Sequence, residues 1–180
     1  MFIKINHILE SSSVQGPGKR FTIWVQGCSL HCSGCQNIDT WDFNLGTSIL
    51  IEDLVEKIKL SEPKGLTITG GEPLDQFKAT FELVQKLFDF KNIFLCTGYK
   101  LDTIVRHHIF HKILDYVDIV CAGPFDESKV CKSKWKGSEN QEVRYLTDRG
   151  KELLKLPVYK TEYRIDKKTG NTLITGFSIK

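Results

Sequence analysis

The stretch Gln26–Trp41, QGCSLHCSGCQNIDTW, places Cys28, Cys32 and Cys35 in a C-x3-C-x2-C spacing directly after a strand-like run. Three thiols so close together cannot all pair in disulfides, and nothing upstream resembles a secretory signal. Structural zinc usually takes four ligands in C-x2-C pairs. Three thiolates from one short loop can instead hold three irons of a [4Fe–4S] cube and leave the fourth iron open. The spacing therefore predicts an iron–sulfur cluster, with a zinc site or three ordinary buried thiols as the alternatives.

Four predicted strands end in unusual residue clusters. Each strand is a short run rich in β-branched and apolar residues, the profile of a buried strand. Apolar residues at helical spacing between the runs predict helices over 49–60, 75–88 and 101–114. This alternation favours a parallel sheet with right-handed crossovers. The strands and the clusters after them are 21–26 with the cysteines, 65–69 with GGEP (70–73), 92–96 with TGY (97–99) and 117–121 with GPF (123–125).

The carboxyl ends of parallel strands lie on one face of a barrel-like α/β fold, which is where its active sites are built. We therefore expect the four clusters to converge on one rim and form a site. A full eight-unit barrel needs about 250 residues, so the 180 residues of this chain predict a partial, open βα barrel. The open side would let a large partner, such as a polypeptide loop, reach the rim.

Local patterns predict three further features of the α/β fold. The segment 10–20, rich in serine and glycine, predicts an irregular and mobile loop. Ser48 is a predicted N-cap for the helix 49–60. A C-terminal β-hairpin is predicted to pair Thr161–Ile165 with Thr172–Phe177.

The GGEP segment has the composition of a ligand-binding turn. Gly70 and Gly71 remove side chains where a ligand would touch the backbone, and glycine adopts positive φ at no steric cost. Pro73 biases Glu72 towards an extended conformation, which directs its carboxylate off the rim. The alternative is a plain strand-to-helix turn. Asn37, shortly after the last loop cysteine, is placed to hydrogen-bond the cluster sulfurs and tune their potential.

The other three cysteines lie outside the loop. Cys96 and Cys121 end apolar strands, where cysteine is more often a core thiol than a ligand. Cys131 lies in a lysine-rich segment. A second cluster built from these three would lack a fourth cysteine, so we expect none.

Composition limits the other classes of function. With 41% hydrophobic residues in 180, the chain predicts a single domain covering 1–180. A formal charge of +3 does not indicate a nucleic-acid partner, and the longest apolar runs fall short of the ~20 residues that a membrane span needs. Six cysteines without an export signal indicate a reducing compartment, so we expect a cytoplasmic protein.

Several motifs carry a family resemblance. Gly34 stands just before the third cysteine, where most radical S-adenosylmethionine (SAM) enzymes have an aromatic residue. The chain resembles these enzymes, and within them the small activating enzymes of anaerobic ribonucleotide reductase and pyruvate formate-lyase. The activating enzymes of anaerobic ribonucleotide reductase share this departure. The motifs are GPGKRFTIWVQGC (16–28), TGGEPL (69–74), TGY (97–99), GPF (123–125) and GSENQ (137–141).

The resemblance implies a cofactor set and its chemistry. The loop cysteines would hold a [4Fe–4S] cluster that binds SAM at its open iron. One electron passed to the sulfonium would release methionine and a 5′-deoxyadenosyl radical, with the protein supplying orientation and exclusion of side reactions. The segment Gly70–Pro73 would bind the SAM amino group with Glu72 as its anionic partner, and Thr97 and Gly98 would line the ribose side.

The resemblance also implies a protein partner. The radical would remove a hydrogen from a glycine of a glycyl radical enzyme such as anaerobic ribonucleotide reductase, with flavodoxin or ferredoxin as electron donor. One departure is Ala122, where ribonucleotide reductase activases tend to carry an acidic residue. Ala122 and the added hairpin leave open an alternative substrate, a small molecule or a ribosomally made peptide. A third reading is a non-catalytic cluster- or zinc-binding interaction module.

Overall fold

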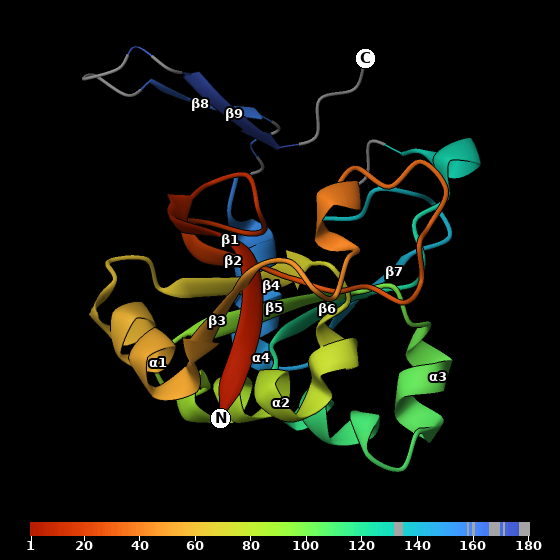
Figure 1. Cartoon of the computed structure of the whole chain (residues 1–180), viewed down its shortest axis with the longest axis horizontal. Coiled ribbons are helices and arrows are strands. Elements are labelled where there is room, and N and C mark those ends of the chain that lie inside the picture. Colours follow the sequence, from red (N-terminus) through yellow and green to blue (C-terminus); the bar gives the residue numbers. More distant parts are fainter. Residues whose placement is uncertain (132–134, 158, 160, 166–169, 171, 177–180) are drawn as a thin grey trace.

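The computed structural model describes residues 1–131, 135–157, 159, 161–165, 170 and 172–176. Within these residues the centre of the fold is a seven-stranded sheet of order β3-β1-β2-β4-β5-β6-β7, open at its two edges (Figure 1). The predicted open α/β architecture is therefore confirmed. The strands are β1 (Phe2–Ser12), β2 (Arg20–Val25), β3 (Thr47–Leu50), β4 (Gly65–Gly70), β5 (Asn92–Thr97), β6 (Ile119–Ala122) and β7 (Glu142–Tyr145).

The sequence predicts a parallel sheet, but three of the seven strands are antiparallel to their neighbours. The four central strands β2, β4, β5 and β6 pair in parallel, whereas β1 and β3 on one side and β7 on the other are antiparallel. β1 leads into β2 through the short segment 13–19, and antiparallel neighbours need no helical crossover. All four residue clusters still lie together, at the carboxyl ends of the four parallel strands.

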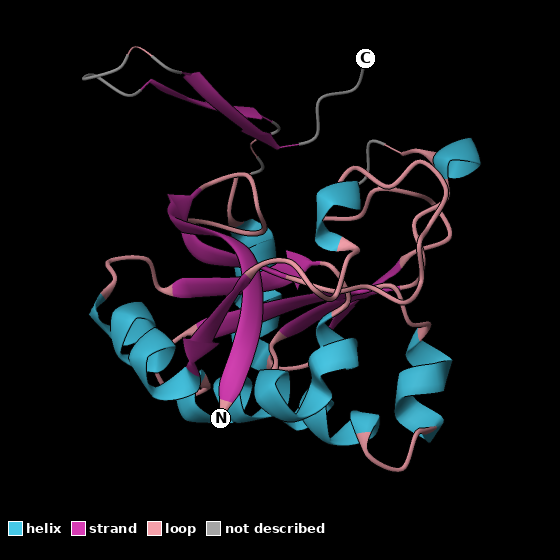
Figure 2. Cartoon of the chain, viewed as in Figure 1, coloured by secondary structure: helices cyan, strands magenta, loops and turns pink. Residues whose placement is uncertain are grey.

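Helices on one side of the sheet bury the core. α1 (Ile51–Leu60), α2 (Phe77–Leu87) and α3 (Leu101–Arg106) gather below the strands, and the loops gather on the opposite side (Figure 2). Ile58 of α1 and Leu83 of α2 are fully buried in the cluster that includes strand residues such as Ile68. Each such side chain contributes about 1.5–3 kcal/mol of hydrophobic stabilisation. None of the described helices is long and apolar enough to cross a membrane.

Two helix predictions were wrong in detail. Ser48 belongs to β3 and caps nothing; the first helical N–H, on Ile51, instead donates to the Met1 carbonyl at 3.0 Å. The predicted helix 101–114 is broken, since α3 ends at Arg106 and a 3₁₀ helix covers Phe110–Tyr116. At the break His107 has an extended backbone, and its ring Nδ1 accepts the Ile109 and Phe110 N–H groups.

The predicted irregular loop over 10–20 is confirmed only for residues 13–19. Residues up to Ser12 belong to β1, and Arg20 opens β2 with a fully buried side chain. The Arg20 guanidinium donates to the Pro17 carbonyl at 2.9 Å and to Thr67 Oγ1 at 2.7 Å, and Thr67 Oγ1 donates to the Gln15 carbonyl at 2.6 Å. Satisfying a buried cation in this way fixes the segment against β4.

The predicted C-terminal hairpin is present as β8 (Thr161–Ile165) and β9 (Thr172–Gly176), which form a separate two-stranded sheet. Phe177, the predicted end of the second strand, lies outside the described residues. The hairpin stands apart from the main sheet, above the end of β1 (Figure 1). Glu162 connects the two, accepting from Ser12 Oγ at 2.8 Å and the Ser13 N–H at 3.1 Å.

Candidate active site

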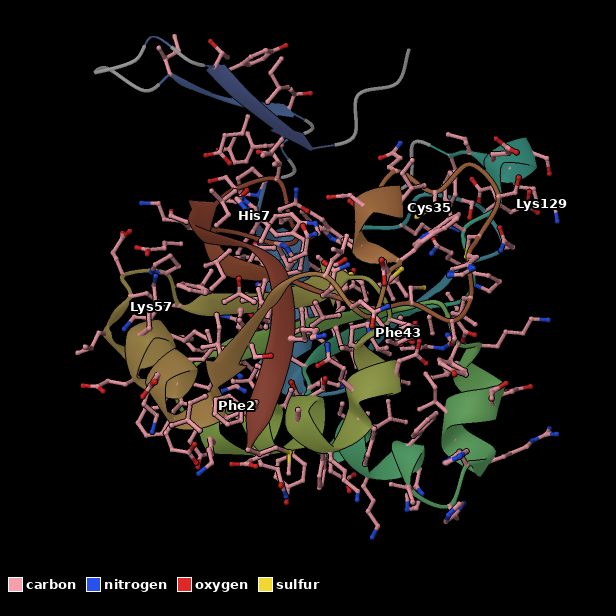
Figure 3. All side chains as sticks on the ribbon, viewed as in Figure 1. Phe2, His7, Cys35, Phe43, Lys57 and Lys129 are labelled. Carbon is pink, nitrogen blue, oxygen red and sulfur yellow. The ribbon has the colours of Figure 1, made fainter. Side chains whose placement is uncertain are left out.

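A cavity of about 250 Å³ lies at the carboxyl ends of the parallel strands. Cys35 lies in the loop-rich part of the molecule with Lys129, away from Phe2 and Lys57 (Figure 3). Of the site residues named from the sequence, Pro73 is buried outside the cavity wall. The others all line it: Cys28, Cys32, Cys35, Asn37, Gly70, Gly71, Glu72, Thr97 and Gly98.

The cysteine loop is closed at its base by backbone hydrogen bonds. The Gly27 N–H donates to the Thr40 carbonyl at 2.7 Å and the Cys28 N–H donates to the Trp41 carbonyl at 3.2 Å. Gln26, the last residue before the loop, is buried, and its side-chain amide donates to the Asp39 and Asp42 carbonyls. The chain therefore leaves and rejoins the protein body at one point, with the three cysteines between.

Backbone N–H groups are directed at two of the three loop sulfurs, those of Cys28 and Cys35. The Asn37 N–H donates to Cys35 Sγ at 3.4 Å. Burial raises the pKa of the Cys28 thiol, while the N–H groups of His31 and Leu30 act in the opposite direction by stabilising its thiolate. All three loop cysteines are free thiols. Thiols flanked by N–H donors are the setting in which iron–sulfur clusters are ligated and tuned.

The GGEP segment packs directly on the base of the cysteine loop. The Gly71 N–H donates to the Val25 carbonyl at 2.9 Å and the Glu72 N–H donates to the Gly27 carbonyl at 2.8 Å. A Cβ on Gly71 would lie only 2.2 Å from the Gly27 carbonyl oxygen. Glycine at position 71 is therefore required by the contact between two segments of this chain.

Glu72 has the extended backbone expected before proline, with φ −105° and ψ 109°. Its carboxylate is not directed off the rim as predicted but runs along it to the next strand end. It accepts from Thr97 Oγ1 and the Gly98 N–H, both at 2.7 Å, and from the Leu74 N–H at 2.8 Å. Because the residue is 1% exposed, burial raises the pKa of its carboxyl to about 7.

Comparison with known proteins gives the site its context. Residues 14–144 match the family described as 4Fe-4S single cluster domain. The anaerobic ribonucleoside-triphosphate reductase-activating protein of Enterobacteria phage T4 is 34% identical over 143 residues, covering 75% of this chain and 89% of that protein. The Escherichia coli K12 protein of the same name is 32% identical over 144 residues, covering 74% and 92%.

This chain belongs to the family of anaerobic ribonucleoside-triphosphate reductase-activating proteins. A further relative of that name from Haemophilus influenzae is 33% identical over 141 residues, covering 71% of this chain and 88% of the relative. Among solved structures, the crystal structure of QueE from Escherichia coli aligns with a TM-score of 0.45 at 22% identity, over 54% of this chain and 53% of that one.

The donor set of this activating protein fits a [4Fe–4S] cluster. Three free thiols on one closed loop leave one corner of a cube without a protein ligand. In the part of the chain that the structure describes, no three His, Cys, Asp or Glu side chains are gathered closely enough for a single metal ion. The GGEP and TGY segments line the same cavity as these three thiols.

The GSENQ segment, whose role the sequence left unexplained, holds the GPF strand end in place. Gln141 accepts the Gly137 N–H at 2.8 Å and donates to the Gly123 carbonyl at 2.9 Å. Asn140 donates to the Pro124 carbonyl at 2.7 Å. These hydrogen bonds fix the GPF segment at the rim of the cavity in the activating protein.

The sequence did not identify several residues of the cavity wall. Trp41 lines the cavity, and its ring stacks on that of His31, with centroids 4.5 Å apart. Cys96, Cys121 and Cys131 line it too, although Cys96 and Cys121 also pack in the core as predicted. The position of Cys96 in the sequence could have indicated that it lines the cavity, because it directly precedes TGY.

Proposed function

We propose that this protein generates a 5′-deoxyadenosyl radical from SAM and uses it to install a glycyl radical on an anaerobic ribonucleotide reductase. A [4Fe–4S] cluster, when bound and reduced, supplies the electron that cleaves SAM. The observation that carries the proposal is the convergence of three free loop cysteines, GGE and TG on one cavity. Relatives that bear the name of activating protein match most of the chain.

The protein's own residues orient and enclose the reactants. Cys28, Cys32 and Cys35 would hold the cluster, and the N–H of Asn37 already supports one of the sulfurs. Gly71 brings the GGEP backbone against the loop without a side chain between them. This close packing holds the cysteine loop and the GGEP segment in a fixed relative position, which orients a ligand bound between them.

Glu72 is the anionic group nearest the Thr97–Gly98 segment, and we assign it to the SAM amino group. Its Oε2 accepts one hydrogen bond, from the Gly98 N–H, and a carboxylate oxygen can accept two. The ammonium of SAM would complete this set. A positive charge beside it would also favour the ionised form of a carboxyl whose pKa burial has raised.

The proposal also includes a protein partner and an electron donor. A glycyl radical enzyme would present its glycine on a loop to the open side of the sheet, and a flavodoxin or ferredoxin would reduce the cluster. The protein would act in the cytoplasm, in keeping with its unpaired cysteines.

The first test is anaerobic reconstitution with iron and sulfide, reduction, and addition of SAM. We expect 5′-deoxyadenosine to form, and a variant with all three loop cysteines changed to Ala to form none. A protein that takes up no cluster would contradict the proposal at its base.

The second test addresses the substrate. Incubation with the co-encoded reductase should produce a glycyl radical signal in electron paramagnetic resonance. Deuterium from a reductase labelled at glycine should then appear in 5′-deoxyadenosine. Formation of 5′-deoxyadenosine without label transfer would instead support the small-molecule or peptide alternative.

A further inference from the structure

Asp75 follows the GGEP segment, and its side chain contacts two other segments of the cavity rim. Oδ2 accepts the Ser29 backbone N–H at 2.6 Å. Oδ1 accepts the Ser29 hydroxyl at 3.0 Å and the Tyr99 hydroxyl at 3.2 Å. One half-buried carboxylate therefore joins the cysteine loop, the GGEP segment and the TGY segment.

The contact to Ser29 acts on the first loop cysteine. Ser29 follows Cys28, and the N–H groups of the next two residues, Leu30 and His31, are directed at the Cys28 sulfur. His31 has a positive φ of 46°, which is uncommon outside glycine and persists only where the surroundings hold it. By holding the Ser29 N–H, Asp75 holds one side of this turn.

We propose that Asp75 is a positioning residue that docks the cysteine loop onto the GGEP and TGY strand ends and so keeps Cys28 in place as a cluster ligand. The sequence suggested for Asp75 only the start of a helix. The proposal rests on cluster binding, as proposed above, and is independent of the identity of the protein partner.

A second carboxylate contacts the loop elsewhere and provides a comparison. Glu127 accepts the Ser33 hydroxyl at 2.5 Å, and a Cβ on Gly34 would lie 2.5 Å from its Oε2. Glu127 is exposed, comes from the segment after GPF, and takes one hydroxyl rather than a backbone N–H. Its removal should therefore affect the loop less than the removal of Asp75.

The test is the rate at which the anaerobically reconstituted protein loses iron to an excess of chelator, compared among Asp75→Ala, Asp75→Asn and Asp102→Ala. Asp102 is an exposed residue of α3 and serves as the matched control. We expect Asp75→Ala to release iron about tenfold faster, as is usual when a group supporting a metal ligand is lost. Asp102→Ala should match the wild type.

The Asp75→Asn variant separates geometry from charge. Its amide oxygen can still accept the Ser29 N–H, and the Ser29 and Tyr99 hydroxyls can turn to accept from the amide nitrogen. We therefore expect it to release iron within about twofold of the wild-type rate. Equal acceleration in Asp75→Asn and Asp75→Ala would assign the effect to charge and overturn the positioning role, and so would a wild-type rate in Asp75→Ala.

A spectroscopic measurement completes the test. In the reduced protein, SAM should change the electron paramagnetic resonance spectrum of the cluster, and this change should be weakened in Asp75→Ala and restored in Asp75→Asn. If Asp75→Ala does not fold, Tyr99→Phe and Ser29→Ala replace it, each with an expected two- to threefold faster release; wild-type rates in both would overturn the proposal. A wild-type protein without a cluster would be a failure of the proposed function itself.

Discussion

Two sets of three cysteines line the same cavity, and their settings differ. Cys28, Cys32 and Cys35 lie on an irregular loop, where backbone N–H groups are directed at the sulfurs of Cys28 and Cys35. Cys96 and Cys121 instead lie side by side in register on the parallel strands β5 and β6, where the strand ladder uses the backbone N–H groups. We therefore expect that proximity to the cavity alone does not make a thiol a ligand, and that free backbone donors around the sulfur distinguish the loop cysteines.

The largest expected effect is on the iron content of variants in which single cysteines of the two sets are changed to Ala. Changing any one loop cysteine to Ala should reduce reconstituted iron to near zero, because three thiolates are the fewest that hold a site-differentiated cube. Changing Cys96 or Cys121 to Ala should leave the iron content unchanged. Iron and sulfide assays after anaerobic desalting measure this, and loss of iron in Cys96→Ala would remove the distinction between the sets.

The second prediction concerns thiol reactivity. Burial raises the pKa of Cys96 to about 12, and it raises the pKa of Cys121 as well. Only the thiolate is alkylated, so in the folded apoprotein at pH 8 Cys96 should react roughly a thousandfold more slowly than in the urea-unfolded chain. Mass spectrometry of iodoacetamide-treated protein gives both rates. Similar rates in the two states would show that the folded protein does not raise the pKa of Cys96.

The third prediction concerns Arg20, whose buried guanidinium holds the segment 13–19 against β4. Arg20→Met leaves buried carbonyl groups such as those of Pro17 and Leu66 without their donor. The free energy of unfolding should fall by about 4 kcal/mol, measured by urea denaturation of the apoprotein. The exposed Arg106→Met serves as control and should stay within about 0.5 kcal/mol. Equal effects in the two variants would contradict the anchoring role of Arg20.

The fourth prediction uses Glu72, which lies between the two sets. Its pKa in the folded protein, about 7, lies above the ordinary carboxyl value of 4.5. The folded state therefore holds a proton that the unfolded state has released, and the apoprotein should lose on the order of 3 kcal/mol of stability as pH rises from about 4.5 to 7. Glu72→Gln should remove this part of the pH dependence. An unchanged slope in the variant would show that Glu72 does not titrate in this range.

The central strands and the four residue clusters could be predicted because their signals are local. An apolar run indicates a buried strand, and glycine or proline indicates a tight turn. Neither signal depends on distant parts of the chain. β3 and β7 could not be predicted in this way, since short edge strands are defined by the neighbour with which they pair. Ser48 shows the consequence, because a residue that fits a helix cap is in β3, opposite Lys4 of β1.

Within the site, residue identity was more predictable than orientation. The carboxylate of Glu72 turns along the rim because its donors, Thr97 and Gly98, come from a different strand end. The contact between Asp75 and Ser29 likewise spans 46 positions of sequence. Such pairs depend on how the strands are placed side by side, which no local pattern contains. The sequence therefore indicated which residue types lie at the rim but not the hydrogen bonds that join them.

The closed base of the cysteine loop has a consequence for the lifetime of the protein. The bonds from Gly27 to Thr40 and from Cys28 to Trp41 join backbone atoms and do not involve iron. A chain whose cluster has been destroyed by oxygen should therefore retain the opening into which a new cluster is inserted. Damage of this kind would be repaired by reloading the existing molecule when anoxia returns, without new synthesis.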